Sequence, residues 1–425
     1  MSSLPVPVSS FLVSINSRTI TGTAWSEVVL KQSAFLAGLL EAATAYCQMN
    51  SVGCLVSTLT QIGYIVNKAF FFYPSPGLGV DNVQQIRAVL PNGTYVTCNR
   101  YQNQDLFFAF RGGGGSTFGV VMENSMLAHP DKPMVAAIFA MPSLNTDELM
   151  SILVENADKW ATQGFGGYLV MSPLSQIMMF ATAQLDYNET IESMKPITDF
   201  IGRFDGIPIG IKNFTAQPSF LDTFLYLPAV NEANEGIAMA SRLVPRRYFQ
   251  DDALKAQLAS IFTDLALSPN PSTSASIPQT DSLFVNIVGP MQYSQNLPPS
   301  DQPGGPGYAS VMPAWRDSLW HVIHVSTFNP ASAPPSVINT YFQKVHDGIG
   351  PLRQLTSDDG GAYQNEADAF EVDPIGSYWG EDNYRRLMEI KSQLEVGGRN
   401  ILSVHQGIGW NPSDSKYECY PSISM

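Results

Sequence analysis

Basic residues are scarce in this chain. Lys and Arg together number 23 against 37 Asp and Glu, so the formal net charge at pH 7 is −14, and only 14% of the residues are charged. Binding to nucleic acid depends on clustered Lys and Arg side chains that neutralise phosphates. The composition therefore excludes a nucleic-acid-binding role and fits a soluble, acidic enzyme.

Cysteine is also rare, with four residues at Cys47, Cys54, Cys98 and Cys419. These positions show neither the short paired spacing of a zinc site nor the density of a disulfide framework. We therefore expect no metal centre.

Long apolar stretches are missing, because no run reaches the roughly 18 to 20 uncharged residues that a membrane helix needs. The nearest candidate, residues 35–49, is interrupted by Glu41 and repeats Leu36, Leu39 and Leu40 at helical spacing. We expect an amphipathic helix there and no membrane association.

The chain start shows no targeting signal. Residues 1–5 lack the basic and apolar regions of a secretory signal peptide. Asn92, Asn188 and Asn213 each begin an Asn-x-Thr triplet, which accepts a glycan only in a chain that enters the secretory route. The compartment therefore stays open.

The chain divides into two parts by its patterns. Residues 10–130 alternate short strand-like and helix-like segments, with two strands flanking a Pro-Asn-Gly turn at residues 91–93. Residues 133–360 indicate a strand, a helix, a hairpin and a second helix, with the helices over 145–163 and 189–203. This order predicts an antiparallel sheet covered by helices.

Gly112-Gly113-Gly114-Gly115 is the most unusual local feature. Without side chains, these residues let backbone N–H groups approach a phosphate or the edge of a flavin. No Lys follows the run, so it is not a nucleotide-binding P-loop. Taken alone, the glycines fit a flexible loop equally well.

The glycine run gains meaning from the motifs around it. It lies in a string that begins Asp105-Leu106-Phe107 and ends Gly119-Val120-Val121, and Gly77-Leu78-Gly79-Val80-Asp81 precedes it. Far downstream stand Tyr363-Gln364-Asn365 and then His405-Gln406-Gly407-Ile408-Gly409. In this order and at about this spacing, the motifs resemble the berberine-bridge-enzyme-like branch of the FAD-linked oxidases, over nearly the whole chain.

This resemblance implies an α+β fold of the PCMH type with two domains. Residues 1–132 and 376–425 would form a remnant of the FAD-binding domain that ends in a berberine-type segment. Residues 133–375 would form the substrate domain, an antiparallel sheet backed by helices.

The resemblance also implies which residues face FAD. Cys54 would stand at a position of covalent flavin attachment. The other cofactor-binding residues that the resemblance implies are Gly79, Asp81, Gly115, Thr117, Gly119, Val120, Asn365 and Gly407.

Tyr363 is the catalytic base that the resemblance implies. Its phenol would take a substrate proton while FAD accepts a hydride; a buried tyrosine with a satisfied hydroxyl is the alternative. Glu366 is the acid of the same motif, either a general acid or base or a structural partner for the backbone.

Two histidines lie in one apolar stretch, His321 and His324. On a strand they would point to opposite faces, which argues against a shared metal site and leaves one of them to face the substrate. We keep His324 as the third catalytic candidate, with a satisfied core histidine as the alternative.

Two departures from the family pattern bear on the cofactor. The first flavin-binding segment of the family has no counterpart here, and Asn67-Lys68-Ala69-Phe70 replaces its Gly-Gly-Gly-His loop. Bulky side chains in that loop would hinder a flavin from approaching the backbone. We therefore expect FAD binding to be weakened or lost, and we expect apolar surface left uncovered to favour self-association.

The activity implied by the resemblance is FAD-dependent oxidation of a small organic molecule, a secondary metabolite or a sugar, with O2 as electron acceptor. The departures leave two alternatives open: a flavin-independent isomerase or cyclase of secondary metabolism, and a non-catalytic, degenerate homologue. Family members are often secreted, which does not by itself assign a compartment to this chain.

Overall fold

The computed structural model describes residues 77–115, 117–204, 210–226, 236–269, 282–289, 291–329, 333–396, 402 and 404–411. Two antiparallel sheets and the helices around them make up this part of the chain. The strands are β1 (Val83–Val89), β2 (Tyr95–Asn99), β3 (Val120–Met126), β4 (Met134–Pro142), β5 (Gly166–Met171), β6 (Ser175–Thr182), β7 (Ile211–Gln217), β8 (Gly236–Pro245), β9 (Ser282–Ile287) and β10 (Ser318–Phe328).

The helices fall into three groups: longer α-helices, shorter α-helices and single 3-10 turns. The longer α-helices are α4 (Thr146–Thr162), α8 (Asp252–Ala266), α10 (Pro335–Leu355) and α12 (Glu381–Ser392). The shorter ones are α3 (Gln104–Phe110), α5 (Tyr187–Ser193), α6 (Lys195–Gly202), α7 (Phe220–Tyr226), α9 (Met291–Ser294) and α11 (Pro374–Tyr378). Single 3-10 turns are η1 (Gly79–Asn82), η2 (Arg246–Phe249), η3 (Pro299–Asp301), η4 (Pro313–Arg316) and η5 (Gln364–Glu366).

The smaller sheet has the order β2-β1-β3. Its β1–β2 hairpin forms where the sequence predicts it: Asn92 Oδ1 accepts the N–H of Thr94 at 2.9 Å, and Gly93 adopts a positive φ of 83°. Asn and Gly are the residues that such a tight turn favours. Phe107 of α3 packs on the sheet beside Ile86, which gives this region its own core.

The larger sheet has seven strands in the order β7-β4-β6-β5-β9-β10-β8, and every neighbouring pair is antiparallel. Alternate side chains along each strand point to opposite faces. Leu169, Phe180 and Val322 point to the face that α4, α6, α8 and α10 cover, where the largest apolar cluster lies. None of the helices in the described ranges is long and apolar enough to span a bilayer.

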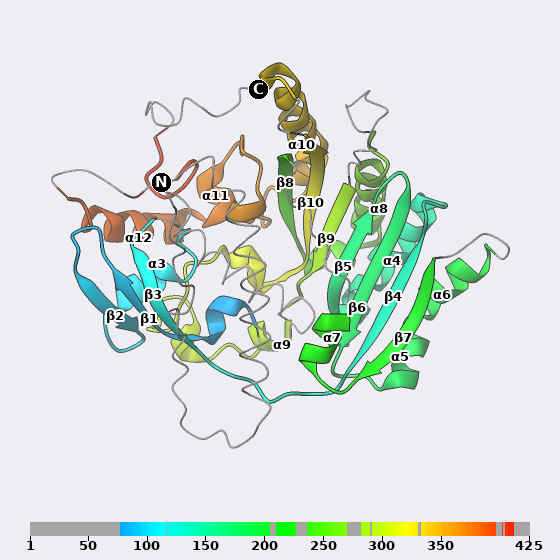
Figure 1. Cartoon of the computed structure of the whole chain (residues 1–425), viewed down its shortest axis with the longest axis horizontal. Helices are drawn as coiled ribbons and strands as arrows, with labels where there is room; N and C mark the ends of the chain where they lie inside the picture. Colours follow the sequence, from blue (N-terminus) through cyan, green and yellow to red (C-terminus); the bar gives the residue numbers. More distant parts are fainter. Residues whose placement is uncertain are drawn as a thin grey trace, which may run out of the picture.

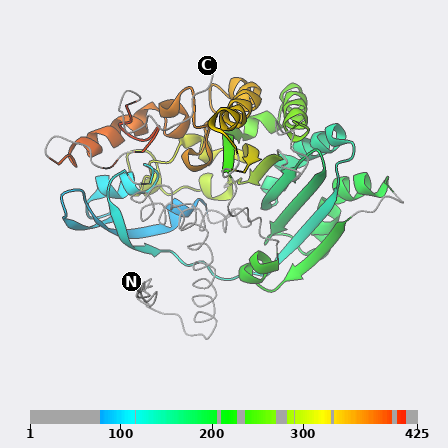
Figure 2. The same cartoon turned by 45° about the horizontal axis from the view of Figure 1, so that its top comes forward.

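The opposite face of the large sheet turns toward the rest of the molecule. Tyr168, Met179 and Leu243 lie on it and pack with Trp315. The small sheet and the large sheet stand on opposite sides, and the segment from α9 to η4 runs between them (Figures 1 and 2). The α+β class and the two-part architecture expected from the sequence are confirmed.

One of the two predicted helices differs from expectation. The helix over 145–163 is confirmed as α4, but the segment 189–203 forms two helices, α5 and α6, that meet at Met194. Pro196 stands in the first turn of α6, and a proline lacks the N–H that a continuous helix would require. The prediction of a single helix was therefore wrong.

After α10 the chain returns to the small sheet. Trp379 and Leu387, from α12 and the segment before it, share an apolar cluster with Phe108 and Phe118. Arg386 of α12 also pairs with Asp105 at 2.8 Å. These contacts suit the expected grouping of residues 376–425 with residues 1–132, which itself stays a prediction.

Candidate functional site

A row of side chains crosses the face of the large sheet opposite α4, α6, α8 and α10. Strand pairing puts Tyr168 of β5 opposite Asn286 of β9, Asn286 opposite His321 of β10, and His321 opposite Leu243 of β8. Four strands therefore contribute one line of side chains. Asn286 and His321 are its polar members, and the surface around them is mostly apolar.

His321 is fully buried in this row. Asn286 Nδ2 donates to His321 Nδ1 at 3.1 Å, which leaves the ring proton of the neutral imidazole on Nε2. Burial lowers the pKa of His321 to about 3, so the ring is neutral at physiological pH. His321 Nε2 and Asn286 Oδ1 are both shielded from water and make no hydrogen bond within the described part of the chain.

The segment that carries Tyr363 lies along the edge strand β8. Leu243 donates its N–H to the carbonyl of Gly361 at 2.8 Å, and the N–H of Tyr363 donates to Ser241 Oγ at 3.4 Å. The turn η5 follows, closed by the N–H of Glu366 on the carbonyl of Tyr363 at 2.9 Å. Backbone pairing therefore sets the position of the Tyr-x-Asn motif.

The Tyr363 ring completes an aromatic cluster over the row. It lies edge-on to His321, with ring centroids 5.8 Å apart, and edge-on to Trp315 at 5.6 Å. Asn365 Nδ2 donates to the Tyr363 hydroxyl oxygen at 2.7 Å. Glu366 Oε2 stands 3.6 Å from His321 Nδ1, which is too long for a hydrogen bond. Of the predicted catalytic residues, the structure thus brings Tyr363 and Glu366 together.

His324 lies elsewhere, on the helix-covered face of the same strand. A Cβ built on Gly348 of α10 would come 2.5 Å from His324 Nδ1, so the ring packs directly under that helix. Burial lowers the pKa of His324 to about 4. The alternation predicted for the two histidines is present, but the histidine of the site is His321 and not His324, because His321 lies on the face that carries Tyr168 and Leu243.

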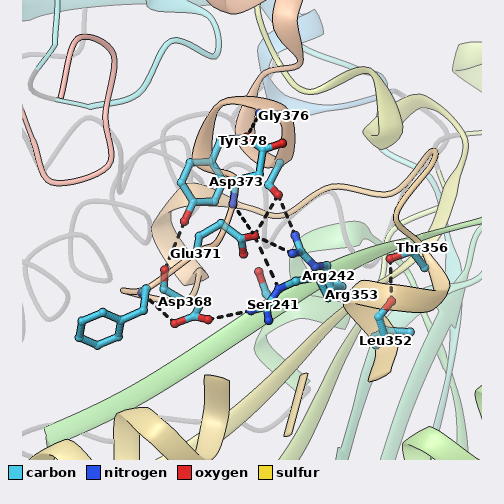
Figure 3. Close-up of polar contacts among 12 residues, drawn as sticks. Ser241, Arg242, Leu352, Arg353, Thr356, Asp368, Glu371, Asp373, Gly376 and Tyr378 are labelled. Carbon is cyan, nitrogen blue, oxygen red and sulfur yellow. Dashed lines mark hydrogen bonds and ion pairs between the residues drawn. The ribbon is translucent and has the colours of Figure 1, made fainter. Parts of the chain in front are cut away.

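A buried ionic network fixes the segment that follows Glu366 (Figure 3). Arg242 of β8 donates to Glu371 Oε1 at 2.7 Å and to Ser377 Oγ at 3.0 Å. Arg353 of α10 donates to Asp368 Oδ2 at 2.8 Å. The side chains of Arg242, Glu371 and Asp368 are all at most 5% exposed, so each charge depends on its partner for compensation.

The same network reaches the C-terminal motif. Tyr378 donates its hydroxyl hydrogen to Gln406 Oε1 at 2.8 Å, and burial raises the pKa of Tyr378 well above its ordinary value. Trp379 Nε1 donates to the carbonyl of Gly112 at 3.0 Å. The segment 361–379 is therefore tied to the large sheet, the glycine run and the residues near 406.

Three of the motifs predicted to face FAD converge on Gln364. A Cβ built on Gly114, whose φ is +90°, would lie 2.5 Å from Gln364 Oε1, and one built on Gly407 would lie 3.5 Å from Gln364 Nε2. Only glycine permits the backbone at Gly114 this conformation and this approach. The glycine run, the Tyr-x-Asn motif and the C-terminal motif thus form one surface.

The remaining cofactor-side residues lie around that surface. Thr117 Oγ1 donates to the carbonyl of Gly115 at 3.0 Å, and Lys391 Nζ donates to the carbonyl of Thr117 at 3.4 Å. Gly119 precedes Val120, the first residue of β3. These backbone contacts hold the loop in one shape next to Gln364.

Asp81, which the resemblance places among the cofactor-binding residues, has an ionic partner within the chain. Its carboxylate makes a two-point ion pair with Arg316, at 2.6 and 2.7 Å, and its side chain is only 3% exposed. Gly79 belongs to the same turn. Asp81 therefore anchors η1 to η4, beside Trp315, and contributes to the site through position.

The convergence of these motifs fits a flavin-binding surface, because glycines without side chains and a polar side chain meet at one place. The described residues supply only part of such a surface. Cys54 and the segment 67–70, on which covalent attachment and the altered loop depend, lie outside the described residues.

Sequence reasoning did not find Asn286, Trp315 or Arg242. Asn286 lies in an apolar strand, Trp315 in a short turn, and Arg242 in the edge strand β8. No local motif marks any of them. A buried Arg in an otherwise apolar strand was the one available signal, since such a charge requires a buried partner.

Known proteins resemble this chain along most of its described length, although no family model matches it. The FAD-linked oxidoreductase cheF of Chaetomium globosum is 29% identical over 356 residues, which cover 81% of this chain and 52% of that protein. The chain spans about half the length of the curated relatives it matches.

Solved structures share the fold. The VAO-type flavoprotein MtVAO713 of Myceliophthora thermophila superposes with a TM-score of 0.64 at 22% identity, over 80% of this chain and 61% of that one. A glucooligosaccharide oxidase of Acremonium strictum superposes with a TM-score of 0.58 at 17% identity, over 80% and 68%. The architecture is that of VAO-type flavoproteins.

The ionic network generates a stability prediction. Glu371→Gln keeps the shape of the side chain but leaves the buried Arg242 without a counter-charge, which should lower the free energy of unfolding by about 3 kcal/mol. Asp382→Asn, which removes the exposed Arg385 pair, should change it by less than about 0.5 kcal/mol. Urea unfolding of both variants measures this, and equal effects would contradict the network's role.

Burial of the two strand histidines predicts a pH dependence. His321 and His324 stay neutral in the folded protein between pH 7 and pH 5, whereas in the unfolded chain they take up protons below about pH 6.5. The unfolded state then binds more protons, so stability falls as the pH falls. Each histidine should remove about 2 kcal/mol between pH 7 and pH 5.

Urea unfolding of the wild-type chain at pH 7 and at pH 5 measures this dependence. His321→Leu should reduce the difference in the free energy of unfolding between pH 7 and pH 5 by the contribution of one histidine, because Leu does not titrate. A variant whose stability falls as steeply as the wild-type's would show that His321 is protonated in the folded state.

Proposed function

We propose that this chain, a member of the FAD-linked oxidoreductases with the VAO-type flavoprotein fold, oxidises a small organic substrate with O2 as the electron acceptor. The observation that carries the proposal is the position of Tyr363. Its hydroxyl is bonded to Asn365, its ring lies beside the buried His321, and the next residue contacts the converged glycine motifs.

Tyr363 is the proposed base. Asn365 Nδ2 donates to the phenol oxygen at 2.7 Å and holds that oxygen in place. In its ionised form the phenol takes the proton of a substrate O–H or N–H, and the adjoining C–H bond is then ready to lose a hydride. FAD, when bound, supplies the acceptor for that hydride and passes the electrons to O2.

Glu366 is the second acid–base residue of the proposal. It is 8% exposed, and its carboxylate oxygen Oε2 lies 3.6 Å from His321 Nδ1. Buried acids next to reacting groups are suited to move protons. We place it behind Tyr363, where it receives the proton that the phenol has taken.

The residues proposed to hold FAD are Gly79 of η1 and, on or beside the converged motifs, Gly115, Thr117, Gly119, Val120, Asn365 and Gly407. The backbone of the glycine loop would face the flavin, because glycines leave it uncovered. Cys54 is proposed as the attachment residue. Asp81 acts indirectly, through Arg316.

The proposal predicts that the purified full-length chain carries flavin or takes up added FAD. The absorbance spectrum from the near ultraviolet to the blue, recorded before and after acid precipitation, measures this. Flavin that stays with the pellet is covalently bound, and Cys54→Ala should release it. Flavin that washes out is bound without a covalent link.

A chain that neither carries flavin nor binds added FAD would overturn the proposal. Acid–base isomerisation by the same Tyr363 and Glu366 pair would then be the function to test, since it needs no electron acceptor.

Tyr363→Phe removes the base and leaves the ring. We expect kcat to fall by ~10²–10⁴-fold with KM changed little, because the hydroxyl acts in proton transfer and the ring packing is retained. The rate at which substrate bleaches the bound flavin without oxygen measures the loss. Tyr187→Phe, on an exposed residue of α5, is the matched control, and equal rates in the two variants would remove Tyr363 as the base.

A further inference from the structure

Two polar atoms in the site have no partner. His321 Nε2 and Asn286 Oδ1 are shielded from water and make no hydrogen bond with any residue that the structure describes. Their side chains are bonded to each other through His321 Nδ1 and Asn286 Nδ2 at 3.1 Å. The pair therefore presents one unused N–H donor and one unused oxygen acceptor.

This arrangement is unfavourable for the folded chain on its own. A buried donor or acceptor without a partner loses its hydration and gains nothing in return. His321 is 0% exposed and Asn286 is 2% exposed, so water does not compensate either atom. Two apolar side chains of similar shape would fill the same places without that cost.

The surroundings define what would satisfy the pair. The ring of Trp315 lies 5.3 Å from that of His321 and the ring of Tyr363 lies 5.8 Å from it, so aromatic carbon flanks the two polar atoms. Among the described residues, the acid Glu366 stands 3.6 Å from His321, and no Lys or Arg makes a hydrogen bond to His321 or Asn286.

We propose that His321 and Asn286 are a recognition pair for an uncharged hydroxyl or carbonyl oxygen of the substrate, attached to an aromatic or similarly flat carbon group. The ligand oxygen accepts from His321 Nε2–H, while Asn286, bonded to Nδ1 on the other side of the ring, keeps the proton on Nε2. A ligand carboxylate would be repelled by Glu366 and would have no basic side chain among the described residues to pair with there. The inference rests on the proposed function only in taking the ligand to be the substrate.

Tyr363 connects recognition with proton transfer. Its half-buried side chain lies edge-on to the His321 ring. A substrate oxygen bound by the pair then lies next to the phenol that takes its proton. His321 and Asn286 are thus specificity residues, and Tyr363 remains the base.

Binding of simple probes to the full-length chain, without turnover, tests the pair. Benzyl alcohol carries the proposed hydroxyl, toluene lacks it, benzoate carries an anion and benzylamine carries a cation. With ¹⁵N-labelled histidine, benzyl alcohol should move the Nε2 resonance of His321 and the other three probes should not. Replacing both partners, in Asn286→Leu with His321→Leu, should weaken benzyl alcohol binding about tenfold and leave toluene binding unchanged.

Thermal stability distinguishes a role of His321 and Asn286 in ligand recognition from a role in core packing. The double variant should melt no lower than the wild-type chain, because it removes two unpaired polar atoms. His321→Gln keeps an N–H donor and should recover part of the affinity for benzyl alcohol. His324→Leu, on the opposite face of the same strand, is the matched control and should leave binding of every probe unchanged.

Three results would each overturn the inference: benzyl alcohol leaves the His321 resonance unmoved, toluene or benzoate binds as well as benzyl alcohol, or the double variant binds benzyl alcohol like the wild-type chain. Flavin plays no part in these measurements. A chain that recognises the hydroxyl but binds no flavin would therefore refute the proposed oxidation and leave the recognition pair standing.

Discussion

The buried ion pairs between the large sheet and the segment 361–379 are the constraint on which the site depends. Arg242 is removed from water and Arg353 is partly exposed, and they compensate the buried charges of Glu371 and Asp368. Those two acids follow the Tyr-x-Asn motif within a few residues, so the motif is held to β8 and α10. The ion pairs thereby set the position of the proposed base.

Next to this ionic network lies a site of the opposite character. His321 is neutral because burial disfavours its charged form, and its partners are an amide and aromatic rings. The charged side chains fix the backbone. The groups that would contact a ligand are uncharged, and some of their polar atoms lack a hydrogen-bond partner among the described residues. Functional sites commonly retain such groups at a cost in stability.

The surface proposed for FAD is assembled from distant parts of the chain. Gly114, Gln364 and Gly407 meet although some 250 and 40 residues separate them in sequence. Each motif supplies backbone or a short side chain, so no one segment forms the surface alone. This explains why the glycine run, taken by itself, fits a flexible loop as well as a binding loop.

Local sequence determined much of the molecule. The Asn-Gly turn, the helix over 145–163, the opposite orientation of His321 and His324, and the identity of the Tyr-x-Asn motif all follow from propensity, alternation or motif, which act over a few residues. The tertiary structure alone decided which histidine faces Tyr363, that Asn286 is its partner, and that Arg242 pairs with Glu371, 129 residues away. Strand register and the pairing of buried charges depend on contacts between distant segments, and no local period in the sequence carries that information.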